Sequence, residues 1–188
     1  MINKLDTINE IVEIEWEMFV NVNGENKVSC QENRATFEKM RRAQFDAWSE
    51  EVLSSYLLDL RKAKEEGRSL LREKYIRMME HTNPADYEIL KKELPPISDE
   101  AKDLISKIWD ELLPQTIRIR ERFPEINEGG RPLRSEDEND YASIETYQKG
   151  ELSTYSLNTL KALYNHIIDL KNKGIDIAFE IQKNSITD

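Results

Sequence analysis

Residues 5–19 read Leu5-Asp6-Thr7-Ile8-Asn9-Glu10-Ile11-Val12-Glu13-Ile14-Glu15-Trp16-Glu17-Met18-Phe19. At the repeat of an α-helix, the apolar side chains of this stretch gather on one face, which indicates an amphipathic helix that packs against a core. The face consists of Leu5, Ile8, Ile11, Val12 and Phe19, and Val22 extends it. Glu15 lies near the centre of this apolar face, whereas the other glutamates of the stretch, Glu10, Glu13 and Glu17, fall outside it.

A buried carboxylate needs a partner, because burial without one costs a large amount of free energy. We therefore expect Glu15 to meet a cation, hydrogen-bond donors or a ligand, or to keep its proton. Arg41 is the favoured partner, because a planar guanidinium can donate two parallel hydrogen bonds to a carboxylate and a lysine cannot. The other candidate partners on the helices that follow are Gln44, Ser55, Asp59, Arg68, Lys74 and Tyr75.

The first candidate pocket is defined by the inward faces of these helices. Its members are Glu15, Arg41, Gln44, Trp48, Asp59, Arg68 and Tyr75. Two interpretations stay open. In the first, Glu15 and Arg41 form a buried structural ion pair that fixes the register of two helices. In the second, the residues line a ligand-binding or catalytic pocket, where ionisable groups in unusual environments are common.

The rest of the chain also reads as helices separated by capping and turn residues. A long second helix is predicted from about residue 33 to residue 66, because this stretch contains no proline or glycine. Ser98 and Ser156 are typical N-caps for two later helices, and Pro114 is expected to bend or break the first of these. The sequence predicts an all-α, single-domain bundle of about six to eight helices over residues 1–188, with a long polar loop over about residues 124–142.

Charge and cysteine content limit the partners and the compartment. A net charge of -10 repels nucleic-acid phosphates and anionic membrane surfaces, so we expect neither nucleic acid nor a membrane as a partner. The single cysteine, Cys30, excludes an intramolecular disulfide and fits a reducing compartment. The start of the chain has no signal-peptide core and no run approaches the length of a membrane span, so we expect a cytoplasmic protein.

Metal and cofactor motifs are missing from the sequence. The chain holds two histidines and one cysteine, too few for the usual zinc sites. It has neither a phosphate-binding loop nor a dinucleotide-binding fingerprint. We therefore expect no metal and no cofactor.

A second candidate site lies further along the chain and consists of Arg131, Tyr147, Glu151 and Tyr155. Arg131 follows two glycines, whose backbone N–H groups could join it in binding an anion. Glu151 and Tyr155 lie in a polar turn between two predicted helices, a common place for functional residues. In the alternative interpretation, Gly150 ends one helix, Ser156 caps the next, and Glu151 serves only the turn.

Several runs of the sequence together resemble one bacterial family. They are Glu15-Trp16-Glu17-Met18-Phe19, Cys30-Gln31, Thr36-Phe37, Met40-Arg41, Gln44-Phe45, Gly130-Arg131-Pro132-Leu133, Glu145-Thr146-Tyr147-Gln148-Lys149-Gly150-Glu151-Leu152 and Thr154-Tyr155-Ser156. The chain resembles a family of uncharacterised cytosolic proteins, a domain of unknown function, over about residues 8–170. The resemblance implies stand-alone proteins, some joined to nucleotidyltransferase-like modules, and hence a nucleotide-handling protein as one candidate partner. It assigns no catalytic residue.

The leading functional hypothesis is a cytosolic helical binding or accessory protein. It would take a small-molecule ligand or a protein partner at the buried polar pocket around Glu15 and Arg41. One alternative is an enzyme in which Glu15 is the general acid or base for a small anionic substrate held by Arg41 or Arg68, although no recognised catalytic motif supports it. The other alternative is a structural subunit that buries an apolar face in a homo-oligomer.

Overall fold

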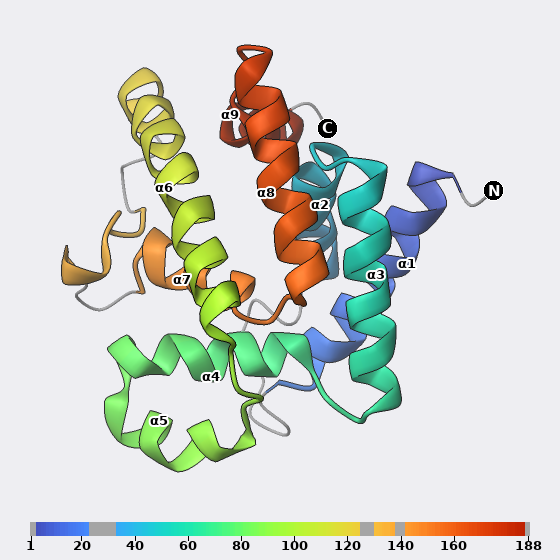
Figure 1. Ribbon diagram of the computed structural model, residues 1–188, viewed down its shortest axis with the longest axis vertical. Helices are drawn as coiled ribbons and strands as arrows, with labels where there is room; N and C mark the ends of the chain where they lie inside the picture. The colour runs from blue at the N-terminus through green and yellow to red at the C-terminus, as the bar shows by residue number, and fades with distance from the viewer. Residues whose placement is uncertain (1–2, 23–32, 125–129, 138–141, 187–188) are drawn as a thin grey trace.

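The computed structural model describes residues 3–22, 33–124, 130–137 and 142–186 of the chain (Figure 1). All regular secondary structure in these ranges is helical, which confirms the predicted all-α class. The elements of this part are α1 (Lys4–Val20), α2 (Arg34–Asp46), α3 (Glu50–Glu65), α4 (Leu70–Thr82), α5 (Pro84–Leu90), α6 (Asp99–Arg122), α7 (Ile144–Leu152), α8 (Leu157–Asn172), α9 (Ile177–Ile186) and the short 3₁₀ helices η2 (Lys91–Glu93) and η4 (Ser135–Asp137). None of these helices combines the length and the apolar character that crossing a membrane requires.

The prediction of one long helix over about residues 33–66 is wrong, because the chain forms α2 and α3 there. This division is one reason why the nine α-helices in the described part exceed the predicted number. Ser49 is the N-cap of α3, and its hydroxyl accepts a hydrogen bond from the backbone N–H of Val52. Glu50 and Glu51 add favourable negative charge to the first turn. A good N-cap therefore separates two helices without proline or glycine.

Two side chains that are distant in sequence contact backbone carbonyl groups at the C-terminal end of α2. The Nζ atom of Lys4 donates to the backbone oxygen of Asp46 at 2.7 Å. The Nε2 atom of His166 lies 2.9 Å from the backbone oxygen of Ala47. Because the last carbonyl groups of a helix lack partners within it, these tertiary contacts stabilise the break between α2 and α3.

The longest helix of the described part is α6, with 24 residues. Ser98 caps it as predicted, and its hydroxyl accepts from the backbone N–H of Ala101. The predicted break at Pro114 does not occur, since α6 continues through this residue to its end. Near Pro114, where the proline removes one backbone donor, Glu111 of α6 pairs with Lys171 of α8, and the side chain of Gln115 accepts from the backbone N–H of Ala178 in α9.

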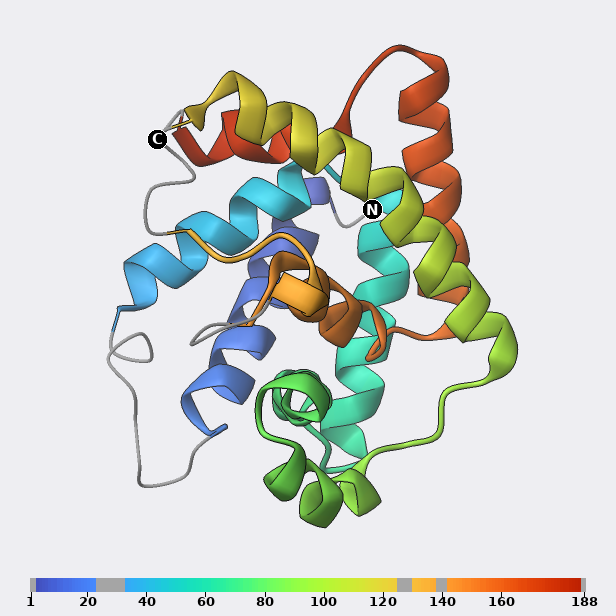
Figure 2. The same cartoon turned by 90° about the vertical axis from the view of Figure 1, so that its left-hand side faces the viewer.

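The helices pack in several pairs, and α3, α6 and α8 form one of the groups. Helix α8 packs against both α3 and α6, and α4 runs across beneath α6 and α8 (Figure 1). Helix α1 packs against α2, α3 and α4, and α9 packs against α2 and α6. The view turned by 90° shows α7 at its centre, on the side that faces the viewer, and α7 contacts α4 and α6 (Figure 2). Side chains of α7 can therefore reach several other helices.

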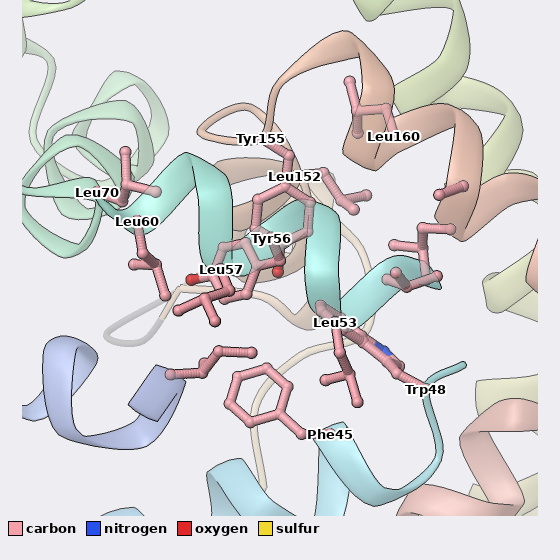
Figure 3. Close-up of a cluster of buried hydrophobic side chains, with 14 of the residues drawn as sticks. Phe45, Trp48, Leu53, Tyr56, Leu57, Leu60, Leu70, Leu152, Tyr155 and Leu160 are labelled. Atoms are coloured by element: carbon pink, nitrogen blue, oxygen red, sulfur yellow. The ribbon is translucent and has the colours of Figure 1, made fainter. Parts of the chain in front are cut away.

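One hydrophobic cluster draws on α1, α2, α3, α4, α6, α7, α8 and α9. Figure 3 shows Tyr56 of α3 beside Tyr155, with Trp48 and Phe45 nearby. The ring centroids of Tyr56 and Tyr155 are 4.8 Å apart, and both side chains are buried. Two buried tyrosine hydroxyls need hydrogen-bond partners inside the core, and these partners lead to the polar site.

Two sequence predictions fall on parts of the chain outside the described residues. Cys30 is among these residues, as are residues 125–129 and 138–141 of the predicted polar loop. Within the described ranges, no group of three or more histidine, cysteine, aspartate or glutamate side chains is arranged to hold a metal ion.

Candidate functional site

Glu15 of α1 is completely buried, with 0 % of its surface exposed. Arg41 of α2 meets it side-on, with Nε 2.7 Å from Oε2 and Nη2 2.6 Å from Oε1. The hydroxyl of Tyr56 in α3 donates to Oε1 at 2.6 Å. The carboxylate is thus sealed by three donors from two neighbouring helices, and Arg41 is the partner that the sequence favoured.

A second carboxylate, Glu151 of α7, approaches the same guanidinium. Its Oε1 atom accepts from Nη1 and Nη2 of Arg41, each at 3.1 Å. The same oxygen accepts from Nε2 of Gln44 at 3.1 Å and from the hydroxyl of Tyr155 at 2.7 Å. Lys74 of α4 donates from Nζ to Oε2 at 2.6 Å. Glu151 therefore connects α2, α4 and α7. Its role is not limited to the turn between α7 and α8.

These side chains form one buried group, which we call the ion network: Glu15, Arg41, Lys74 and Glu151, with the neutral donors Gln44, Tyr56 and Tyr155. Its two carboxylates balance its two cations. Lys74 is 2 % exposed and Arg41 is 9 % exposed. Each charge has an oppositely charged, hydrogen-bonded neighbour, which is the condition under which proteins tolerate buried ions.

Burial and the opposite charges set the pKa values of the network. Burial alone would raise the pKa of Glu151, but Arg41 and Lys74 outweigh it and hold that pKa well below the ordinary value of 4.5. Burial acts to lower the pKa of Lys74, yet Glu151 raises it above 10.5. Burial and then Glu15 raise the pKa of Tyr56 well above 10.0. At neutral pH Glu151 and Lys74 are therefore charged and Tyr56 keeps its proton.

A pocket of about 490 Å³ opens beside the network. It is lined by Phe19, Asn33, Thr36, Phe37, Met40, Arg41, Leu71, Lys74, Tyr75, Arg131 and Tyr147. We call it the cationic pocket, because the charged residues of the described part that line it are Arg41, Lys74 and Arg131. The Nζ atom of Lys74 lies 3.5 Å from the ring centroid of Tyr147, and the guanidinium carbon of Arg131 lies 5.3 Å from it. Two cations thus lie close to one aromatic ring.

Aromatic rings form another part of the lining of the cationic pocket. Phe19 and Phe37 are stacked with ring centroids 5.0 Å apart. The ring of Tyr75 lies 6.4 Å from that of Phe19. The pocket therefore offers flat apolar surface next to positive charge.

A second, smaller cavity of about 190 Å³ also borders the ion network, at Gln44 and Tyr155. Its lining is mostly apolar and includes Trp48, Trp109 and Leu163. No charged side chain of the described part lines it. The cations of the network, Arg41 and Lys74, line the cationic pocket, so a ligand bound there would contact them.

The structure brings most members of the two predicted candidate sites together. Glu15, Arg41 and Gln44 of the first site share the network with Glu151 and Tyr155 of the second. Tyr75 of the first site lines the cationic pocket together with Arg131 and Tyr147 of the second. Trp48 packs edge-on against the rings of Tyr56 and Tyr155.

Asp59 and Arg68 of the first predicted site lie apart from Glu15. Asp59 accepts from the backbone N–H of Ser156 at 2.9 Å and from the hydroxyl of Thr159 at 2.7 Å, so it stabilises the start of α8. Arg68 pairs with Glu73, with Nε 2.8 Å from Oε1. Asp59 is on the side of α3 that meets α8, whereas Tyr56 is on the side that meets α1, and only the latter reaches Glu15.

Two members of the network were not assigned correctly from the sequence. Lys74 was considered only as a partner of Glu15, but it binds Glu151. It shares one helical face with Leu71 and Met78, so an ionisable residue on an apolar face was the signal for it, as for Glu15. Tyr56 carried no such signal, because a tyrosine on an apolar helix face is usually part of the core.

A family model described as "Protein of unknown function (DUF4125)" matches residues 5–188. This range contains all residues of the ion network and of the cationic pocket. No curated protein and no solved structure matches the chain.

Proposed function

The chain belongs to the DUF4125 family of proteins of unknown function, and we propose that it binds a small anionic molecule with a planar apolar part in the cationic pocket. The observation that carries the proposal is that the charged side chains of the described part that line this pocket are all cations, in a chain with a net charge of -10. Glu15 and Glu151 balance Arg41 and Lys74 from inside the core, so the net positive charge at the pocket comes from Arg131, and it attracts anions. The volume of about 490 Å³ is in the range of small-molecule sites.

Arg131 is the cation with the most freedom to bind a ligand. Its side chain is exposed, and among the described residues it donates to the backbone oxygen of Ala142 at 3.0 Å without forming an ion pair. A guanidinium has five N–H donors, so several remain for a carboxylate or a phosphate. Phe19 and Phe37 would pack against the planar part of the ligand.

The carboxylates of the ion network fix two of the cations that line the cationic pocket. Arg41 and Lys74 are held by Glu15 and Glu151, so their positive ends are fixed before a ligand arrives, which reduces the ordering cost of binding. Glu15 is sealed and already accepts three hydrogen bonds. These contacts support a positioning role for Glu15 and favour a binding protein over an enzyme that uses Glu15 as general acid or base.

The test is a panel of anionic aromatic molecules, such as aromatic carboxylates and nucleoside monophosphates, with uncharged analogues of the same shape. Thermal shift identifies ligands, and isothermal titration measures their affinity. We expect Arg131→Gln to weaken binding about 10- to 100-fold, the equivalent of losing one charge-assisted hydrogen bond. Arg118→Gln is the matched control, because Arg118 pairs with Asp176 away from the cationic pocket.

Three results would contradict the proposal. The first is a panel without any ligand-dependent shift, which would favour a protein partner or a homo-oligomer instead. The second is an equal loss of affinity in Arg131→Gln and Arg118→Gln, which would show a general charge effect. The third is chemical conversion of a panel molecule during the incubation, which would favour the hypothesis of an enzyme over that of a binding protein.

A further inference from the structure

Arg77 of α4 is a cation without an ion pair in the described part of the chain. Within that part its guanidinium makes one hydrogen bond, from Nη2 to the backbone oxygen of Pro95 at 2.8 Å. Its Nε atom is buried and has no hydrogen-bond partner among the residues that the structure describes. Glu73 and Glu80 act on Arg77 through their charge but do not pair with it.

An arginine in this state lowers the stability of the fold. Burial lowers the pKa of Arg77, and the carboxylates around it only partly oppose this effect. A buried N–H group without a partner also costs free energy, because its lost hydrogen bonds to water are not replaced. The ions of the network, by contrast, are all matched. The sealed Nε atom is out of reach of a ligand, but Nη1 makes no hydrogen bond within the described residues and is the donor that a group from outside the chain can meet.

Arg77 lines a cavity of about 270 Å³ between α4, the segment before α6 and the turn before α8, which we call the Arg77 pocket. Lys62 and Arg68 also line it, and Asp59 is the acidic residue in its lining. The Asp59 carboxylate is already bound to the start of α8. The Arg77 pocket is therefore richer in cations than in anions, and its least satisfied cation is Arg77.

Two helix ends border the Arg77 pocket, and acidic side chains already offset their positive charge. Ser98 and Ser156, the N-caps of α6 and α8, both line it. Asp99 and Glu100 lie in the first turn of α6, and Asp59 accepts from the backbone N–H of Ser156 at the start of α8. The attraction of the Arg77 pocket for an anion therefore comes from its cationic side chains and not from the helix ends.

Arg77 also borders another cavity of about 270 Å³, on the side of α7. Glu80 and Glu145 line that cavity together with Lys149. Its acidic and basic side chains are balanced, so it offers an anion no net attraction. The two cavities differ in charge although they share Arg77, and the Arg77 pocket is the one suited to an anion.

We propose that the Arg77 pocket binds the phosphate group of a small molecule, with Arg77 donating hydrogen bonds to its oxygens. A tetrahedral phosphate has several oxygens to share among Arg77, Lys62 and Arg68, the cations of this lining, whereas a carboxylate is best met by one side-on guanidinium. This pocket is separate from the cationic pocket. The proposal is therefore independent of the function proposed above.

The test is isothermal titration of the full chain with inorganic phosphate, and with acetate as the carboxylate for comparison. We expect phosphate to bind more tightly than acetate, and Arg77→Gln to weaken phosphate binding about 10- to 100-fold, the equivalent of one lost charge-assisted hydrogen bond. Arg61→Gln is the matched control, because it removes one positive charge from a surface pair with Glu10. Urea unfolding should show that Arg77→Gln still folds, because it loses one hydrogen bond, from Nη2 to the backbone oxygen of Pro95, and also removes a buried donor that has no partner.

Several outcomes would overturn the proposal. They are an absence of phosphate binding by the wild type, equal phosphate affinity in Arg77→Gln and the wild type, and tighter binding of acetate than of phosphate. Loss of phosphate binding in Arg131→Gln but not in Arg77→Gln would assign the anion to the cationic pocket and would also overturn it. If Arg77→Gln does not fold, Arg77→Lys keeps the charge without the guanidinium, and unchanged phosphate affinity in that variant contradicts the proposed hydrogen bonds.

Discussion

Glu151→Gln is the change that tests the ion network most directly. It keeps the size of the side chain but removes the charge that Lys74 binds at 2.6 Å. Lys74 is 2 % exposed, so water cannot replace the lost carboxylate. Removing one partner of a buried ion pair usually costs about 3–5 kcal/mol, because the remaining charge stays buried without compensation. We expect a loss in this range for Glu151→Gln.

The double variant Lys74→Met/Glu151→Gln separates a missing charge from a general loss of packing. It removes one cation and one anion together and leaves Arg41 paired with Glu15. Its destabilisation should be smaller than the sum of the two single changes by about 2 kcal/mol, since no unpaired ion remains. The free energies of unfolding come from urea titrations followed by far-ultraviolet circular dichroism and tryptophan fluorescence.

The pH dependence of the same variants gives a second readout. The folded protein holds the pKa of Glu151 well below 4.5, so below pH 4.5 the unfolded chain takes up the proton that the folded chain resists. The contribution of Glu151 to stability is therefore present above this pH and is lost on acidification. The stability difference between wild type and Glu151→Gln should shrink as the pH falls. Additive single changes, or a cost below about 1 kcal/mol for Glu151→Gln, would refute this account of the network.

Three further changes test the packing around the site, each by urea unfolding. Alanine usually stabilises a helix relative to glycine by about 1 kcal/mol, but a Cβ atom at Gly150 would lie 2.9 Å from Cγ of Met78. Gly150→Ala should therefore lower stability by about 1–3 kcal/mol, and a gain would disprove the close approach of α4 and α7. Tyr56→Phe removes the donor to Glu15 and should cost about 1.5–3 kcal/mol; a neutral result would mean that this bond contributes nothing. Ser49→Ala removes the N-cap of α3 and should cost about 1 kcal/mol, and no loss would argue against the capped break between α2 and α3.

The sequence was informative where local chemistry decides the structure. The apolar face of residues 5–19 predicted α1, and the N-caps Ser98 and Ser156 marked the starts of α6 and α8. The position of Glu15 on that face also indicated a buried partner, and Arg41 was the guanidinium best placed to serve. Ser49 is a capping signal of the same kind, but a serine also occurs inside helices, and a stretch without proline or glycine is equally compatible with one continuous helix.

The sequence by itself determined an all-helical chain with a misplaced acid, since helix periodicity and capping depend on residues only a few positions apart. Only the tertiary structure decided that Glu151, 110 positions from Arg41, would complete the same ion network, and that Asp59 and Arg68 would lie elsewhere. It also decided that Arg77 would be left without an ion pair in the described part of the chain. Such contacts depend on the angles at which the helices cross and on which face of each helix points toward its neighbour. The packing of the whole core sets both, and a pattern within a few residues does not contain this information.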